Sequence, residues 1–226
     1  MTTEEKNLIE IGDFFVIYSN ATKKPYISED RECFIFDTMK EADKFIGEDK
    51  RFYRNDRSEK LSQKVYCSKY YSYGIRTIVL KKIKGERVRI SIEKADVKPR
   101  QYLNDETNAN VYRLMETRKK KYLRSLKDNM LFCPISISIR LKGQYPKVSY
   151  CNALKNNEMY MPLFTTVQEF EKWNSKQANR WRPLGTTISK IEPERKGHSI
   201  IINPDSDKLI LYNKVIKDVL KEKKKE

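Results

Sequence analysis

The sequence contains few of the residues that build common catalytic sites. It has 7 glycines, and neither a G-x-x-x-x-G-K-[ST] loop nor a G-x-G-x-x-G loop occurs, so a glycine-rich turn that cradles phosphates is unsupported. No G-x-S-x-G elbow for a serine nucleophile is present. The paired carboxylates Glu192 and Glu194, and Asp205 and Asp207, lie in turn-like segments, where acidic residues favour turns and solvation. We therefore expect a protein that is not an enzyme and binds no cofactor.

Histidine is almost absent, and no two cysteines form a C-x-x-C pair. The single His198 follows Gly197 at a predicted strand start, and we interpret it as an exposed turn residue rather than as a catalytic base. The four cysteines lie among Val, Ile, Phe or Tyr in predicted strands, which indicates buried or half-buried free thiols rather than a redox or ligand role. They are Cys33, Cys67, Cys133 and Cys151. Metal-ligand spacing is missing, so we expect no structural zinc site.

Long apolar runs are also missing. No stretch approaches the roughly 18 apolar residues that a membrane-spanning helix needs. The N-terminal residues 1–15 are acidic at first and carry no basic region before an apolar run, so they do not have the pattern of a signal peptide. The expected location is the cytoplasm.

What the sequence does have is positive charge and many aromatic residues. Its 226 residues include 47 basic and 31 acidic side chains, for a net charge of +16, and most of the excess lies in residues 104–226. Such a charge attracts anions, whether a nucleic acid, an acidic protein or a membrane surface. The 14 Tyr, 9 Phe and 2 Trp are spread along the chain, which is typical of a folded protein of one or two small domains.

Two parts of the chain repeat one pattern. Residues 16–21 (VIYSNA) match residues 148–153 (VSYCNA), and soon afterwards residues 34–45 match residues 162–173. The corresponding pairs are Phe36 and Phe164, Thr38 and Thr166, Glu41 and Glu169, and Phe45 and Trp173. In both copies the threonine and glutamate have the spacing of a helix capping box, and apolar residues then recur at helical spacing. Each copy is predicted to run through strands into a short amphipathic helix.

A hairpin is predicted at the end of each copy. The first is formed by residues 77–80 and 88–92, the second by residues 199–202 and 209–211, each with turn residues between its strands. The fold class is therefore α+β, with two tandem small repeats, each a mixed or antiparallel sheet with helices packed on one side.

Between the copies, residues 108–127 have the spacing of one helical stretch, and residues 131–139 that of a strand. We predict a boundary after residue 103. Residues 1–103 then form a divergent repeat, residues 104–220 a second domain, and residues 221–226 a frayed basic tail.

The second copy resembles the N-terminal domain of the SseB family. The resemblance rests on Pro162-Leu-Phe-Thr-Thr166, on a helix that ends at Trp173, and on Ile201-Ile-Asn-Pro-Asp-Ser206, where Asp205 replaces the family's usual glycine. It is good over about residues 104–217 and weaker over residues 7–97. The resemblance implies a small cytoplasmic α+β domain of poorly defined molecular activity, with no catalytic residue to carry over.

Two clusters of cations are candidate contacts for an anionic partner. Arg118, Lys119, Lys120 and Lys121 are consecutive, so in a helix at least some of them face solvent; they form either a solvated helix face or a phosphate-binding patch. Arg87 and Arg89 share one face of a predicted strand.

Aromatic residues near cations are a second kind of candidate. Tyr70, Tyr71 and Tyr73 precede the Arg87 strand, and they either stack bases of a single-stranded nucleic acid or pack in the core. Trp181, between Arg180 and Arg182, is either an exposed contact residue or a plug of the core.

We therefore expect a non-enzymatic interaction or accessory protein of the SseB-like type, whose partner is an unidentified protein or another anionic molecule. The alternative is a basic nucleic-acid-binding accessory protein, of the kind that serves a mobile element.

Overall fold

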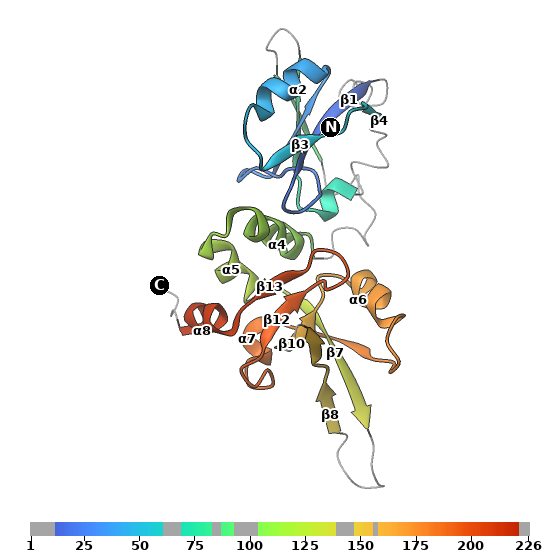
Figure 1. The fold of residues 1–226 in the computed structure, drawn as a ribbon, viewed down its shortest axis with the longest axis vertical. Coiled ribbons are helices and arrows are strands. Elements are labelled where there is room, and N and C mark those ends of the chain that lie inside the picture. The colour runs from blue at the N-terminus through green and yellow to red at the C-terminus, as the bar shows by residue number, and fades with distance from the viewer. Residues whose placement is uncertain are drawn as a thin grey trace. The chain divides into compact units, whose positions relative to one another are not determined.

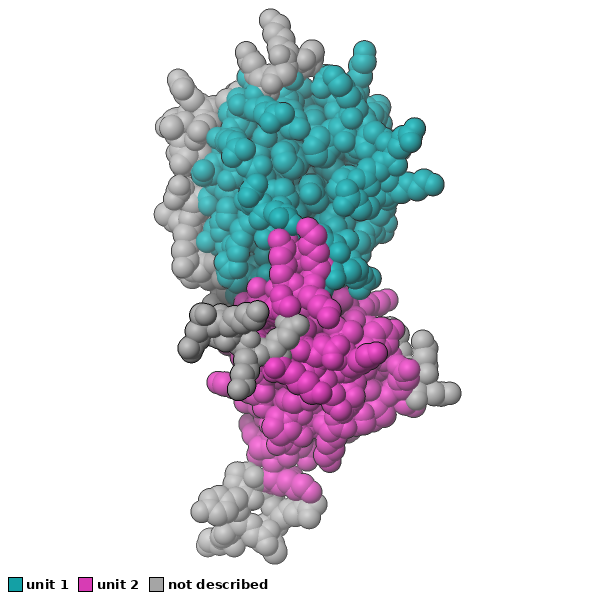
Figure 2. Space-filling model, turned by 90° about the vertical axis from the view of Figure 1, so that its left-hand side faces the viewer, with its two compact units in different colours: residues 1–118 teal, residues 119–226 magenta. Residues whose placement is uncertain are grey.

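The computed structural model describes residues 12–60, 69–82, 87–92, 104–138, 147–155 and 158–221. The chain is an α+β protein, and it divides into two compact units, Met1–Arg118 and Lys119–Glu226 (Figure 2). The sequence predicts a boundary after residue 103, whereas the two units divide after Arg118.

The first unit is built on a mixed sheet with the order β3-β1-β2-β5-β6 (Figure 1). β2 runs parallel to β5, and β1 and β6 run antiparallel to their neighbours β2 and β5. A short strand, β4, also pairs with β1. The elements are β1 (Asp13–Ser19), β2 (Glu32–Phe36), α2 (Met39–Ile46), β3 (Phe52–Arg54), β4 (Glu59–Lys60), β5 (Thr77–Lys81) and β6 (Arg87–Ser91).

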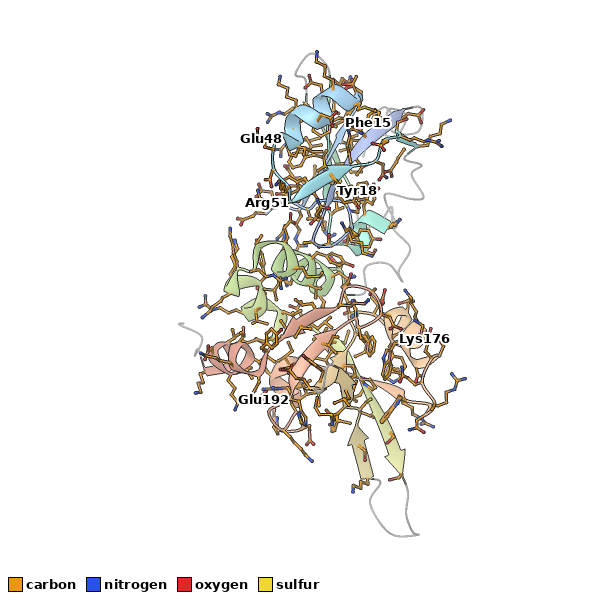
Figure 3. All side chains as sticks on the ribbon, in the orientation of Figure 1. Phe15, Tyr18, Glu48, Arg51, Lys176 and Glu192 are labelled. Carbon is orange, nitrogen blue, oxygen red and sulfur yellow. The ribbon has the colours of Figure 1, made fainter. Side chains whose placement is uncertain are left out.

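Alternation along β1 places successive side chains on opposite faces of this sheet. Phe15 packs with the buried cluster of Ile17, Phe36 and Ala42, which joins the sheet to α2. Tyr18 points to the other face, where its hydroxyl donates to the Glu59 carboxylate at 2.8 Å (Figure 3).

Helix α4 (Asp105–Thr117) belongs to the first unit because long-range polar contacts hold it there. Asp105 forms an ion pair with Arg76, and Asn108 donates to the Ser72 carbonyl at 2.7 Å. Gly74 has a φ of 89°, and a Cβ atom at this position would lie 2.4 Å from the Cβ of Ala109. Glycine at position 74 therefore allows the close approach of α4.

The second unit contains two sheets, with the orders β13-β12-β10-β9 and β11-β7-β8 (Figure 1). An isolated bridge between Phe132 and Phe164 connects them. The elements are α5 (Lys120–Leu126), β7 (Leu131–Ser138), β8 (Lys147–Tyr150), β9 (Ala153–Lys155), β10 (Glu158–Leu163), α6 (Val167–Asn174), β11 (Arg182–Thr186), α7 (Ile188–Ile191), β12 (Ser199–Ile202), β13 (Leu209–Leu211) and α8 (Asn213–Lys221).

The two units share one arrangement of strands. In each unit the strand that precedes the capped helix pairs antiparallel with an earlier strand and parallel with the first strand of a hairpin. Both predicted hairpins are confirmed. The hydroxyls of Thr38 and Thr166 accept from the backbone N–H groups of Glu41 and Glu169, so the predicted N-caps are also confirmed.

The predicted single helical stretch over residues 108–127 is wrong, because two helices occupy this region. Arg118 has a φ of 55°, a left-handed conformation that ends α4, and its N–H donates to the Leu114 carbonyl. Helix α5 then begins at Lys120. None of the helices that the structure describes is long and apolar enough to cross a membrane.

A candidate anion-binding surface on two packed helices

Arg87 and Arg89 lie on the exposed face of β6, as predicted, but Arg89 already has an anionic partner. Its Nη1 atom is 2.8 Å from Oε1 of Glu32. Arg87 is opposite Lys81 in the ladder, and the Lys81 ammonium lies 4.4 Å from the centre of the Phe45 ring. Because one arginine is paired within the sheet, this strand is a weak site for an external anion.

The tyrosines that precede β5 do not form a stacking platform. Tyr70 and Tyr71 are buried, with exposed fractions of 2% and 5%, and the Arg76 guanidinium lies 3.8 Å from the Tyr71 ring centre. The interpretation as core residues is therefore confirmed for Tyr70 and Tyr71, and base stacking on them is excluded by burial. Tyr73 is half-buried and packs edge-on against Tyr112.

Trp181 packs against the aromatic core of the second unit. It contacts the buried cluster of Cys151, Phe164, Phe170 and Trp173, and it is half-buried. Asn174 fixes its backbone, because the Trp181 N–H donates to Asn174 Oδ1 at 3.1 Å while Asn174 Nδ2 donates to the Trp181 carbonyl at 3.2 Å. Trp181 is therefore a packing residue of the core rather than an exposed contact residue.

The neighbours Arg180 and Arg182 are exposed, and Arg182 begins β11. The basic run at residues 118–121 is also exposed, but it is divided between the units. Arg118 is the last residue of the first unit, and Lys119 is the N-cap residue of α5. Lys120 and Lys121 form the first turn of that helix.

Helix α5 has an outward face that is entirely basic or neutral. Tyr122, Leu123 and Leu126 are buried, so the positions opposite them face solvent. These positions are occupied by Lys120, Lys121, Arg124 and Ser125, all exposed.

Helix α8 carries three more lysines that sequence reasoning missed. Ile216 and Val219 form its buried side. Lys214, Lys217 and Lys221 recur at three- and four-residue spacing, which places them together on the exposed side of the helix. Lys221, the first residue of the predicted tail, is the last residue of α8, and residues 222–226 lie outside the described residues. The signal that could have found this face is the spacing of the lysines from residue 214 onwards.

Helices α5 and α8 pack side by side (Figure 1). Their outward cations form what we call the α5–α8 surface, defined by Lys120, Lys121, Arg124, Lys214, Lys217 and Lys221. Asp218 is the one acidic residue within the two helices. No carboxylate of the described residues pairs with Lys120, Lys214 or Lys217, so their charges are available to a partner.

No family model, no curated protein and no solved structure matches this chain.

A hollow of about 390 Å³ lies beside the start of α8. Its walls include Met159, His198, Tyr212 and Lys214. The buried Arg195 side chain shapes this region, because its guanidinium donates to both Glu192 oxygens at 2.8 Å and to the His198 carbonyl. His198 is half-buried, and within the described residues its ring forms no hydrogen bond with a serine, cysteine or carboxylate.

The described thiols are buried in surroundings that keep them protonated. Burial raises the pKa of Cys133 to about 12 and that of Cys151 to about 11, and it also raises the pKa of Cys33. A thiol is nucleophilic as the thiolate, so these three have the character of core residues. Cys67 lies outside the described residues. In the part of the chain that the structure describes, no three His, Cys, Asp or Glu residues are placed to hold a metal ion.

Proposed function

We propose that this chain is a non-enzymatic accessory protein of the SseB-like type, which binds an anionic partner through the α5–α8 surface. The observation that carries the proposal is the gathering of six cations on two packed helices that contain a single acidic residue. Exposed cations at this density attract an acidic molecule and accelerate its association.

A non-enzymatic role is supported by the state of the nucleophilic groups. The three described thiols have raised pKa values, and within the described residues no hydrogen bond joins the His198 ring to a nucleophile or a carboxylate. We place the protein in the cytoplasm, where free thiols are common.

The SseB-like assignment and the duplication are part of the same proposal. The shared strand directions support them, as do the matched environments of Phe36 and Phe164, which are both buried against a ring of the following helix. In this view the second copy has gained the strands β7 and β11 and the basic helix α5, and its β8, which holds Val148 of the repeated segment, pairs with β7 rather than with β10.

Nucleic acid is the alternative partner, and the position of the tyrosines argues against it. The stacking platform that the sequence offers at Tyr70 and Tyr71 is buried, so the aromatic half of a single-strand site is missing there. We therefore favour an acidic protein surface.

Charge reversal on the surface tests the proposal. We expect Lys217→Glu with Lys221→Glu to weaken binding of a fluorescent polyglutamate peptide about tenfold, because attraction is replaced by repulsion at two sites. The matched control is Lys40→Glu with Lys44→Glu, which changes the net charge equally on the exposed side of α2. Equal loss in the two double variants would show that only net charge matters and would refute the proposed surface.

A salt titration of the wild-type chain distinguishes the alternative partner. A single-stranded oligonucleotide that binds more tightly than the peptide, with a log–log salt slope of several units, would identify nucleic acid as the ligand instead.

A further inference from the structure

Four large apolar side chains of the second unit are exposed close to the α5–α8 surface. Leu154, Met159, Tyr212 and Val215 have exposed fractions of 67%, 41%, 56% and 37%. Met159 and Tyr212 both line the hollow beside α8. Leu154 is directly opposite Met159 in the β9–β10 ladder, and Val215 lies one helical turn after Tyr212.

Met159 and Tyr212 line the hollow, which also has a cationic side. Lys214 belongs both to the wall of the hollow and to the α5–α8 surface. Glu158 also lines the hollow, and its carboxylate accepts a hydrogen bond from the Tyr160 hydroxyl. The volume of the hollow is within the range of small ligand pockets, about 300 Å³ or more, but the hollow is shallow and open to solvent. It can therefore take one or two apolar side chains of a partner.

We propose that the hollow and the α5–α8 surface form one docking site for an acidic segment of a partner protein. An apolar side chain of the segment sits between Met159 and Tyr212, and neighbouring carboxylates meet Lys214 and Lys217. The inference rests on the proposed function and adds the class of partner and its anchor. Exposed apolar patches with a charged rim are typical of protein interfaces.

The composition of the site favours a protein segment over a nucleic acid. Of the four exposed side chains, only Tyr212 offers an aromatic face to a base. Asp218 and Glu158 lie within or beside the site and would repel a continuous row of phosphates. The carboxylates of a protein segment can instead be spaced so that each one contacts an individual lysine.

The shape of the site disfavours a lipid surface. Met159 and Tyr212 line a shallow hollow, whereas insertion into a bilayer interface needs apolar side chains that protrude. A partner segment with an apolar side chain flanked by carboxylates fits both the shape of the hollow and the positive charge of the α5–α8 surface.

Two fluorescein-labelled peptides of equal charge test the inference with the full chain. One alternates glutamates with Leu and Phe, and the other has Ser at the apolar positions. We expect the apolar peptide to bind about tenfold more tightly in anisotropy titrations, because one large apolar side chain becomes buried. Met159→Ser should reduce this preference to about twofold or less.

The matched control is Met39→Ser in the first unit, since Met39 is exposed by 40% and Met159 by 41%. It should leave the preference unchanged. Equal affinities of the two peptides for the wild-type chain, or equal effects of the two methionine variants, would overturn the anchor site. The effect of Lys217→Glu with Lys221→Glu on both peptides would still support the proposed function in that case. Tighter binding of a dT20 oligonucleotide or of phosphatidylserine vesicles, lost on Met159→Ser, would overturn the class of partner.

Discussion

Asn203 and Thr165 are joined by two hydrogen bonds that tie the β12–β13 turn to the end of β10. Asn203 Oδ1 accepts from the Thr165 N–H, and Asn203 Nδ2 donates to Thr165 Oγ1, both at 3.0 Å. Nδ2 also donates to Asp207 at 2.6 Å. Asn203 is buried and has a φ of 48°, which asparagine tolerates better than most residues. The side-chain amide of Asn203 and its backbone conformation therefore make separate contributions to the stability of the second unit.

We expect Asn203→Ala to lower the free energy of unfolding of the second unit by about 2–4 kcal/mol, because it leaves the buried Thr165 N–H unpaired and strains the backbone. Urea unfolding followed by tryptophan fluorescence measures this, since both tryptophans, Trp173 and Trp181, lie in that unit. Asn203→Gly is the control: it removes the same amide but accepts the positive φ, so it should be less destabilising by about 1 kcal/mol. An alanine variant as stable as wild type would contradict the role of the amide.

Glu116, on α4, gives the first unit a pH-dependent stability. Burial raises the pKa of Glu116 to about 7, and its Oε1 atom is buried without a hydrogen bond. The nearby charges that act on it are Arg51, which opposes the shift, and Asp49, which adds to it. Between its ordinary pKa and about 7, the unfolded chain loses the proton while the folded chain keeps it. Stability therefore falls as the pH rises through this window.

We predict that Glu116→Gln removes this loss, so that the variant is more stable than wild type at pH 8 and gains little at pH 4. Thermal unfolding followed by far-UV circular dichroism at several pH values measures the difference. The matched control is Glu106→Gln on the same helix, because a hydrogen bond with Arg31 lowers the pKa of Glu106. Glu106→Gln should lower the stability at neutral pH, which is the opposite of the effect expected for Glu116→Gln. A pH-independent difference for Glu116→Gln would rule out the titration.

Local patterns predicted much of the fold, and long-range contacts explain most of what they missed. The capping threonines and both hairpins depend on spacings of a few residues, so the sequence displays them directly. The placement of α4 depends on Gly74 and Arg76, which are distant in sequence from the helix. Helix α8 buries Ile216 and Val219 within a lysine-rich segment, which hides its periodicity. A row of tyrosines and arginines likewise does not reveal that Tyr70 is buried.

A substitution of Trp181 distinguishes a role in core packing from a role in contacting a partner. We expect Trp181→Ala to destabilise the second unit by about 2–4 kcal/mol, because removal of the half-buried indole leaves a cavity beside Phe164 and Trp173. Binding of the acidic peptide to the folded variant should not change. The exposed neighbours serve as controls, since Arg180→Ala and Arg182→Ala should change stability by about 0.5 kcal/mol or less. Weaker peptide binding by the tryptophan variant at full stability would restore the contact interpretation.

The capping threonines test whether the two units are separate cooperative structures. Thr38→Ala and Thr166→Ala each remove an acceptor of one backbone N–H at a helix start, so each should cost about 1 kcal/mol, and the serine variants should recover most of it. Because both tryptophans lie in the second unit, only Thr166→Ala should shift the urea midpoint seen by fluorescence. Thr38→Ala should instead shift a transition seen by far-UV circular dichroism. An equal fluorescence shift in both variants would mean that the chain unfolds as one structure, since loss of a cap in the first unit would then have destabilised the core around Trp173.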